Sequence, residues 1–351
     1  MRYHNVCIAA LSYSLPPHVL TSAEIEARLA PVYDRLGFPA GRLEMMTGIR
    51  ERRFWDAGTR PGAISAATAA QALAASGVDR REIGLLVHGS VCRDQLEPAT
   101  ASGVHHALEL RQAALVFDVS NACLGLLNGV LLLANMIELG QVRAGLIVGT
   151  EIGRDLVEAT IDTLIGNPHV TRQDVKLAFA SLTIGSGSAA IVLCHRGLAR
   201  TENRLLGGAF RAETGSHQLC AGGPAAETFG DSRPRMQTDS EALLQAGVEL
   251  AGQTWGETLR ELGWSNADVG KAFTHQVGKM HRRLLYEKLG LDPRIDFSTV
   301  EFLGNTGAAA LPLTAAIGLE RGHVRPGERM AWLGIGSGLN AIMLGIDWQG
   351  A

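Results

Sequence analysis

A cysteine, a histidine and an asparagine stand in three short segments rich in small residues, and their side chains could carry acyl chemistry. Cys123 lies in the segment SNACLG, His275 in FTHQVG and Asn305 in LGNTGA. A thiol can hold an acyl group as a thioester, while an imidazole and a carboxamide can stabilise an enolate oxygen. Together the three residues predict a site for acyl transfer.

Cys123 is expected at the point where a strand over 114–119 passes into a strongly apolar helix over 123–139. The positive end of a helix dipole and its free N–H groups favour a thiolate over a thiol. The alternative is an inert core cysteine, and that interpretation suits Cys7 and Cys194. For Cys123 the strand-to-helix position favours a nucleophile.

His275 and Asn305 are weak signals when each is taken alone. A histidine at the end of a short apolar strand is often only a satisfied polar residue. An asparagine between glycines often serves turn geometry. Their occurrence after Cys123, in the order Cys, His, Asn, makes them candidate catalytic residues.

Two Gly-Ser-Gly segments, at 185–187 and 336–338, resemble phosphate-binding loops only superficially. Both lie between strand-like segments and neither opens a helix, which is the wrong context for a dinucleotide or Walker site. A tight turn that presents a backbone N–H is the better interpretation. The N–H groups of Ser337 and Cys123 could then form an oxyanion hole for a thioester carbonyl.

Short apolar runs alternate with longer helical patterns along the whole chain, which indicates an α/β fold with buried sheets. The expected strands are 6–11, 85–88, 114–119, 145–149, 189–194, 271–274, 330–333 and 341–346. The expected helices are 22–28, 64–75, 98–108, 123–139, 239–262, 279–289 and 312–321.

An internal repeat supports two related halves. The stretch IGSGSAAIVL over 184–193 recurs as IGSGLNAIML over 335–344, and the stretch over 82–88 is echoed over 268–274. Two markers in the same order indicate a duplicated architecture. We therefore predict an N-terminal half over 1–195 that carries the cysteine and a C-terminal half over 196–351 that carries the histidine and asparagine. An insertion at about 151–181 is expected to cap the site.

Composition excludes several other classes of protein. The net charge is −3, so a basic footprint for nucleic acid is absent. Five widely spaced cysteines without a CxxC pair favour a reducing cytosol, and the N-terminus lacks the pattern of a signal peptide. The most apolar stretch, over 124–139, is too short and too polar to span a bilayer. We expect a cytoplasmic protein without an integral membrane segment.

Several histidines and arginines are candidate binding groups. The pairs His105-His106 and His275/His281 lack metal-ligand spacing, so no metal site is expected. Arg50, Arg52 and Arg53 form a small basic cluster after a Thr-Gly pair. The cluster is either a solvated, ion-paired face or the mouth for a phosphopantetheine or CoA carrier.

These residues resemble the thiolase superfamily, specifically its ketoacyl synthase III branch. The marks are TGIRERR over 47–53, NAC over 121–123, HQ over 275–276 and GNT over 304–306. Within the branch the chain is most similar to the OleA-type members, which join two fatty acyl-CoAs head to head. Supporting stretches are RDQLEP over 93–98 and LGIGSGLN over 333–340.

The resemblance implies a five-layered αβαβα fold and an obligate homodimer. It implies that Cys123 takes the acyl group, and that His275 and Asn305 bind the oxygen of the second thioester as it becomes an enolate. Coenzyme A thioesters are then substrates, and no redox cofactor or metal is needed. Tentative CoA contacts are Arg50, Arg53 and Lys279.

Glu97 decides between members of the branch. Ordinary ketoacyl synthase III enzymes carry an apolar aromatic residue at the matching place, because loss of carbon dioxide from a malonyl thioester makes their carbanion. OleA-type enzymes must remove a weakly acidic α-proton, and a carboxylate reaching in from the partner subunit can do so. The alternative for Glu97 is an acid at a helix N-terminus with Pro98 as the first helical residue.

Three residues depart from the branch, and the first two bear on the carrier. Met46 and Met280 stand where ketoacyl synthase III enzymes have arginines, which is more compatible with CoA than with acyl carrier protein. Leu303 replaces a histidine often seen before the Gly-Asn pair.

We therefore predict a non-decarboxylative Claisen condensation of two medium- or long-chain fatty acyl-CoAs to a β-keto acid. The alternative is a decarboxylative 3-oxoacyl-acyl carrier protein synthase III that uses a malonyl thioester. A thioesterase or simple acyltransferase, and a non-catalytic subunit of a heterodimer, are further alternatives. Acyl chain length and a downstream biosynthetic partner stay open.

Overall fold

The computed structural model describes residues 1–224 and 233–350. Five strands of its N-terminal part lie in the order β1-β7-β6-β4-β5. Strands β4, β5 and β6 run parallel, while β7 is antiparallel to both of its neighbours. Their bounds are β1 Val6–Ser14, β4 Ile83–His88, β5 Leu115–Asp118, β6 Ala144–Glu151 and β7 Gly187–His195.

The C-terminal part repeats this arrangement in the order β8-β13-β12-β11. Here too two strands are parallel, β11 and β12, and β13 is antiparallel to its neighbours. The bounds are β8 Arg204–Ala212, β11 Lys271–Thr274, β12 Glu328–Gly336 and β13 Asn340–Trp348. One register pair, Cys7 with Arg204, joins β1 to β8. The boundary between residues 195 and 196 stays a prediction.

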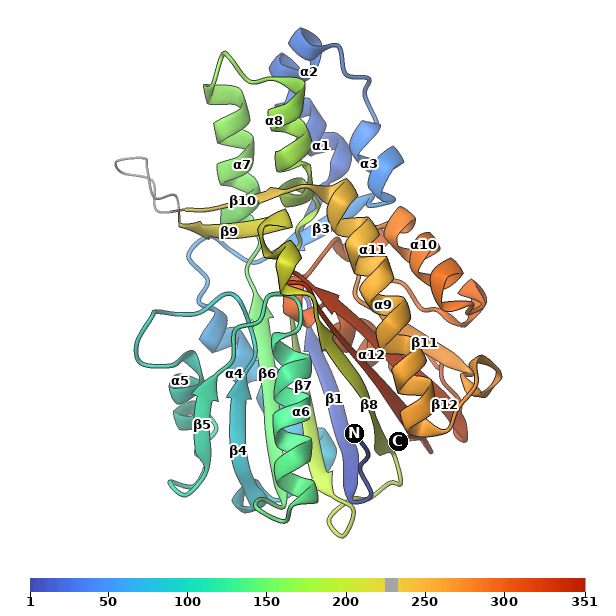
Figure 1. Ribbon diagram of the computed structural model, residues 1–351. Coiled ribbons are helices and arrows are strands. Elements are labelled where there is room, and N and C mark those ends of the chain that lie inside the picture. The colour runs from blue at the N-terminus through green and yellow to red at the C-terminus, as the bar shows by residue number, and fades with distance from the viewer. Residues whose placement is uncertain (225–232, 351) are drawn as a thin grey trace.

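Helices fill the space between the sheets and cover their outer faces, giving the predicted five layers (Figure 1). The middle layer holds α6 Gly125–Glu138 and α12 Ala310–Glu320. The outer layers hold α4 Pro61–Ser76, α5 Thr100–Ala107, α9 Ser240–Leu262 and α10 Lys279–Leu289. Along β7, Ile191 packs in the middle layer and Val192 in the outer one, as the period of a strand requires. The αβαβα fold is confirmed.

The apolar sequence of the two middle helices explains their place. A helix that is hydrophobic on all sides is stable only where both faces are covered. In α12 nearly every position is buried, and α6 buries residues such as Leu127 and Leu133. In the part of the chain that the structure describes, no helix is long and apolar enough to cross a bilayer.

A separate helical group lies above the sheets at the top of Figure 1. Two of its helices follow β6, namely α7 Arg154–Gly166 and α8 Arg172–Ala178. They share an apolar core with three N-terminal helices, α1 Ser22–Arg28, α2 Ala30–Leu36 and α3 Arg42–Thr47. These helices occupy most of the insertion expected at 151–181, whose capping role stays a prediction.

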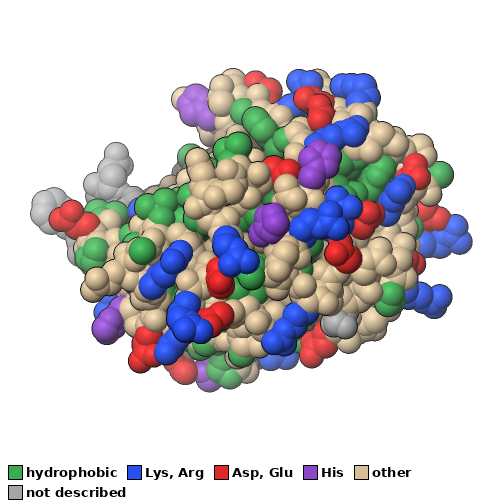
Figure 2. All heavy atoms as spheres, turned by 90° about the horizontal axis from the view of Figure 1, so that it is seen from below, with side chains coloured by type: hydrophobic (Ala, Val, Ile, Leu, Met, Phe, Trp, Pro, Cys, Tyr) green, Lys and Arg blue, Asp and Glu red, His purple; other side chains and the backbone are tan. Residues whose placement is uncertain are grey.

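Short elements complete the chain. Two small antiparallel pairs are β2 His18–Thr21 with β3 Glu51–Phe54, and β9 Cys220–Pro224 with β10 Pro234–Thr238. A four-residue helix, α11 Val300–Leu303, precedes the Gly-Asn pair. On the face opposite the helical group, basic and acidic side chains are interspersed (Figure 2).

Candidate active site

Cys123 lies in a sharp turn between β5 and α6. Ala122 before it has a φ of +44°, a left-handed conformation that is unusual for alanine. The turn is pressed against the end of β12, because a Cβ atom on Gly336 would lie 3.4 Å from Cβ of Cys123. A Cβ there would also lie 3.1 Å from Cγ of Leu124, which is tighter than ordinary contact, so glycine suits this close approach of the second Gly-Ser-Gly turn to the cysteine turn.

The backbone N–H groups of Ser337 and of Cys123 itself act on the thiol of Cys123 and favour its charged form. Both lower its pKa, yet burial outweighs them and raises the pKa of Cys123 to about 12. The residue keeps some exposed surface, but its sulfur is surrounded by protein atoms. We expected the helix terminus to favour a thiolate at Cys123. That expectation is wrong, because desolvation of the buried sulfur penalises the thiolate more than the N–H groups stabilise it.

His275 directly follows β11, and its N–H donates to the carbonyl of Leu333 on β12 at 3.2 Å. Because β11 and β12 are parallel, His275 and Ser337 lie beyond the same ends of neighbouring strands. The imidazole is 5% exposed, and its Nδ1 has no hydrogen-bond partner among residues 1–224 and 233–350. Burial, with a smaller contribution from His281, lowers the pKa of His275 to about 3, so the ring is neutral near pH 7.

Gln276 connects His275 to the segment that leads to Asn305. Its Oε1 accepts hydrogen bonds from Ser298 Oγ at 2.9 Å and from the N–H groups of Thr299 and Val300 at 3.2 Å each. Val300 begins α11, which ends directly before the Gly-Asn pair. One amide side chain therefore holds the two candidate regions in a common frame.

Asn305 is fixed by both its backbone and its side chain. Its N–H donates to Thr183 O at 2.9 Å, and its carbonyl accepts the N–H of Gly185 at 2.8 Å. Its Oδ1 accepts the N–H of Gly307 at 3.0 Å. With the oxygen occupied, the Nδ2 group is the end of the carboxamide left to donate to a ligand oxygen.

Glu97 lies apart from these residues, on the exposed loop between β4 and α5. Within 1–224 and 233–350, no hydrogen bond or ion pair joins it to Cys123, His275 or Asn305. The alternative of a helix-terminal acid is wrong, because α5 begins at Thr100 and not at Pro98. The carboxylate at that helix start is Asp118, which accepts the Thr100 N–H at 2.8 Å.

The three arginines after the Thr-Gly pair do not share one surface. Arg50 is exposed and pairs with Glu301 at 3.2 Å. Arg52 is fully buried and donates to Leu182 O at 3.0 Å, and Arg53 donates to Pro16 O at 3.2 Å. Arg52 and Arg53 are adjacent in β3 and therefore point to opposite faces, whereas Arg50 lies before the strand begins.

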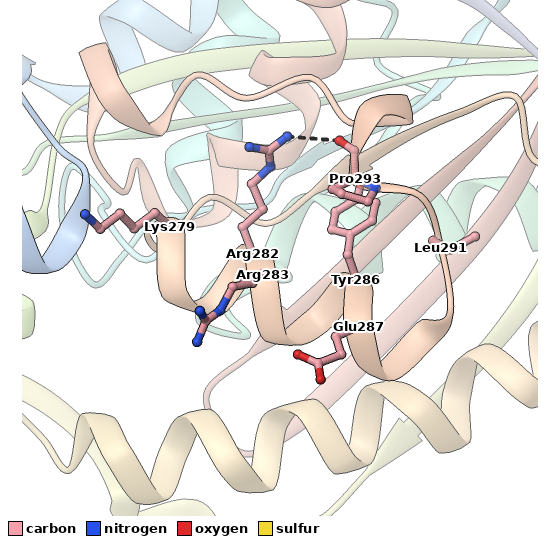
Figure 3. A pocket seen from close by; sticks show the side chains of 7 residues that line it. All are labelled: Lys279, Arg282, Arg283, Tyr286, Glu287, Leu291 and Pro293. Carbon is pink, nitrogen blue, oxygen red and sulfur yellow. Dashed lines mark hydrogen bonds between the residues drawn. The ribbon is translucent and has the colours of Figure 1, made fainter.

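Lys279 begins α10 beside the Thr-Gly turn, and its Cβ lies 3.2 Å from the position a Cβ on Gly48 would take. It lines an open cavity of about 380 Å³ (Figure 3). Arg282 and Arg283 line the same cavity, and Arg282 donates to the Pro293 carbonyl at 3.1 Å. Of the three tentative CoA contacts, Lys279 is therefore the one at a basic hollow.

The two methionines that depart from the branch lie on neighbouring elements, α3 and α10. Met46 and Met280 are 43% and 44% exposed. Their turns touch, because a Cβ on Gly278 would lie 3.0 Å from Thr47 O. Leu303 is buried instead and packs into the central core.

Glu151 is a residue of the site that the sequence analysis missed. It ends β6, is buried, and accepts the N–H groups of Val91 at 3.1 Å, Cys92 at 3.3 Å and Ala308 at 3.3 Å. Burial raises the pKa of this carboxyl. An acid that ends an otherwise apolar strand was the available signal.

Within the described ranges there is no group of three or more His, Cys, Asp or Glu residues that could hold a metal ion. The expectation that the reaction needs neither metal nor redox cofactor stays a prediction.

Comparisons with known proteins place the chain in a family. The family model described as 3-oxoacyl-[acyl-carrier-protein (ACP)] synthase III C terminal matches residues 259–348. An acyl-CoA:acyl-CoA alkyltransferase of Shewanella oneidensis is 43% identical, over 99% of this chain and all of the relative. A protein of the same name from Xanthomonas campestris is 36% identical, over 99% of this chain and all of that protein.

Solved structures agree with this placement. A cysteine-to-alanine variant of Xanthomonas campestris OleA superposes with a TM-score of 0.93 at 35% identity, over 99% of this chain and 98% of the other. A cysteine-to-serine variant of the same protein, with bound lauric acid and lauroyl-CoA, has a TM-score of 0.92 at 35% identity, over 99% of this chain and all of the other.

The layered fold, with a cysteine turn closed by a Gly-Ser-Gly turn, defines an acyltransferase of the thiolase superfamily in its ketoacyl synthase III-like branch. Within that branch the chain belongs to the OleA family of acyl-CoA:acyl-CoA alkyltransferases.

Proposed function

We propose that this enzyme catalyses the non-decarboxylative Claisen condensation of two fatty acyl-CoAs, giving a β-keto acid through an acyl-cysteine intermediate. The observation that carries the proposal is the turn of Cys123, which packs against the Gly-Ser-Gly turn after β12, while the neutral His275 follows the neighbouring parallel strand β11. Full-length similarity to acyl-CoA:acyl-CoA alkyltransferases supports the choice of substrate.

In the first step the sulfur of Cys123 attacks the carbonyl of one acyl-CoA. The new C–S bond forms as the bond to the CoA sulfur breaks, and the thiol proton ends on the departing CoA thiol. The N–H groups of Cys123 and Ser337 would receive the oxyanion, because they already converge beside the sulfur. A preorganised pair of donors needs no rearrangement when the charge develops.

In the second step another acyl-CoA binds with its carbonyl oxygen toward His275 and the Nδ2 group of Asn305. Both groups are neutral donors, which suits an oxygen that gains negative charge as an enolate forms. Glu97 of the partner subunit takes the α-proton. The carbanion attacks the thioester on Cys123, so that a C–C bond forms and the bond to sulfur breaks. Hydrolysis of the remaining thioester then releases the β-keto acid.

The proposed homodimer is supported by the surface around Glu97. Leu96 is 89% exposed and Val91 52% exposed on the same loop. Leu115 on the neighbouring β5 is 50% exposed, and β5 forms the edge of its sheet. Unpaired sheet edges with apolar neighbours are typical of contact surfaces. A second copy seated here would bring a Glu97 toward the other chain.

Arg53 and Lys279, with Arg50, remain the proposed contacts for the CoA phosphates, with Lys279 first among them because its hollow is open and basic. The cytoplasmic location expected from the cysteine pattern also stays a prediction.

A decarboxylative synthase is the second candidate, because the matching family model is that of synthase III. The experiment that separates the two is incubation of the purified protein with one long-chain acyl-CoA and no malonyl donor, followed by mass spectrometry. A β-keto acid, or the ketone from its decarboxylation, is the expected product. Release of CoA and fatty acid alone would point to a thioesterase. Product that forms only with malonyl-CoA, together with carbon dioxide, would establish the second candidate.

A further inference from the structure

Glu151 is a buried carboxylate beside the thiol that no step of the proposed reaction uses. It is 6% exposed, and within the described residues it forms no ion pair with a lysine or arginine. Its charge contributes to the raised pKa of Cys123. A carboxylate without a cationic partner is costly to bury, so we expect Glu151 to have a specific role at the end of β6.

The contacts of Glu151 join two loops that are far apart in the sequence. Through the N–H groups of Val91 and Cys92 it holds the start of the loop that carries Glu97. Through the N–H of Ala308 it holds the turn that carries Asn305. One side chain at the end of β6 thus contacts the segments of both groups assigned to the condensation step.

The contact with the Asn305 turn is close enough to set its shape. A Cβ atom on Gly307 would lie 3.1 Å from Cδ of Glu151, which is tighter than ordinary van der Waals contact, so glycine suits this position beneath the carboxylate. Gly307 has a φ of +56°, and its N–H is the donor that occupies Oδ1 of Asn305. The carboxylate therefore supports the turn that aims the Nδ2 group of Asn305.

We propose that Glu151 is a positioning residue that sets the Asn305 amide and the Glu97 loop in the geometry needed for condensation. This inference rests on the proposed function, since it takes the roles of Asn305 and Glu97 from there. Acyl transfer to Cys123 uses donors that come from the Cys123 turn and from Ser337, and Glu151 hydrogen-bonds neither segment in the part of the chain described.

Two rates measured on the same enzyme preparation test this inference. Acylation of Cys123 is followed by the mass of the intact protein after mixing with one acyl-CoA, and condensation by the β-keto product. Glu151→Ala should lower condensation about 100-fold, because a displacement of about 1 Å in a reacting geometry can cost that much. Acylation should stay within about threefold of wild type. The condensation rate of Glu151→Gln should lie between those of Glu151→Ala and wild type. Its Oε1 can still accept the N–H groups of Val91 and Ala308.

Glu138→Gln is the matched control. Glu138 also accepts backbone N–H groups, those of His4 and Asn5, but at the opposite end of α6 from Cys123. Its replacement should leave the ratio of the two rates unchanged. If Glu151→Ala fails to fold, Glu151→Asp, which keeps the charge on a shorter side chain, should show the same selective loss of condensation.

A double variant identifies the route of the effect. If Glu151 acts through Asn305, removing it from an Asn305→Ala enzyme should cost much less than removing it from wild type, since residues that act as a unit are not additive. The same comparison in a Glu97→Ala enzyme tests the route through the Glu97 loop. A full additional loss in both backgrounds, or equal losses of acylation and condensation with a lower melting temperature, would overturn the inference. If wild type condenses only with malonyl-CoA, the proposed function fails, and the same ratio measured with that donor still decides the role of Glu151.

Discussion

The turn of Cys123 and the loop of Glu97 are built in opposite ways. The cysteine turn is buried, packs against the end of β12, and has backbone N–H groups that act on its sulfur. The Glu97 loop is exposed and includes Leu96, which is almost fully accessible in the single chain. A single chain thus holds all the groups that we propose for the first acyl transfer. The base proposed for the second step lies on the exposed loop, where we propose that a second chain binds.

Burial has a consequence for the charge state of the cysteine turn. It raises the pKa of Cys123 to about 12 and lowers the pKa of His275 to about 3. At pH 7 both side chains are neutral, so the resting site holds no thiolate–imidazolium pair. The N–H donors beside the sulfur then act mainly on charge that appears during the reaction.

Replacing the buried nucleophile should have the largest effect. Cys123→Ala should abolish acylation, because no other group in the turn can form a thioester. The intact mass of the variant after incubation with acyl-CoA should stay unchanged. Cys220→Ala is the control, since Cys220 is near enough to interact electrostatically with the Cys123 thiol but has no assigned role. An acyl group still bound to the Cys123→Ala protein would move the nucleophile elsewhere.

Replacing the exposed base should spare the first step and impair the second. Glu97→Ala should form the acyl-enzyme normally and condense about 10²–10⁴ times more slowly, the range typical of a lost general base. Acylation is read from the intact mass and condensation from the β-keto product. Unchanged condensation would remove Glu97 from the mechanism.

Mixed dimers test whether Glu97 acts on the cysteine of the other chain. If Glu97 acts on the other chain, mixing the Glu97→Ala and Cys123→Ala proteins under exchange should restore roughly one quarter of wild-type activity. Half of the dimers are then hybrids with one complete site. Wild type mixed in equal amount with the double variant serves as control. Its hybrids contain no complete site, so exchange should lower its activity from about one half to about one quarter of wild type, the share of the remaining wild-type dimers. Failure to complement in dimers shown to exchange would place Glu97 in the same chain as its cysteine.

The pH dependence of the thiol should report its burial. Far below its pKa a thiol ionises about tenfold more for each unit of pH. Because the pKa of Cys123 is raised to about 12, its alkylation by iodoacetamide should keep rising through about pH 9. Site-specific mass spectrometry gives the alkylation rate of Cys123. Glutathione in the same tube is the reference, because the alkylation rate of an ordinary thiol levels off above its pKa. A plateau near pH 8 for Cys123 would show that the N–H donors outweigh burial.

Many helices and strands could be predicted from the sequence, because the pattern of apolar and polar residues within each segment determines them. The helices 22–28 and 279–289 and the strand 271–274 were predicted with the observed bounds. The central strand β8 was missed. Two glycines interrupt it, and Gly208 has a φ of +152° with Met343 O 1.9 Å from where its Cβ would be. Glycine is depleted in strands, so composition alone indicated a connection.

The features that escaped prediction depend on tertiary packing. A helix N-terminus indicated a thiolate at Cys123, but the pKa is decided by atoms from β12 and the loops around it. The importance of Glu151 depends on its contacts with Val91 and Ala308, which are remote in the sequence. Three nearby arginines suggested one basic cluster, whereas Arg52 is buried, Arg53 points to the opposite face of β3, and Arg50 pairs with Glu301 before the strand begins.

Replacing the exposed cations Lys279 and Arg50 should have the smallest effect on activity. These variants test whether a charged side chain that is open to solvent contributes little to acyl-CoA binding. Lys279→Ala should raise the KM for acyl-CoA about two- to threefold with kcat unchanged, since an exposed charge contact is worth no more than about 1 kcal/mol. The increase should fade at high salt, where such charges are screened. Arg50→Ala should change KM less, because its guanidinium already pairs with Glu301. A larger loss for Arg50 than for Lys279 would mean that acyl-CoA displaces this ion pair, and would move the carrier site from the hollow on α10 to the strand after the Thr-Gly turn.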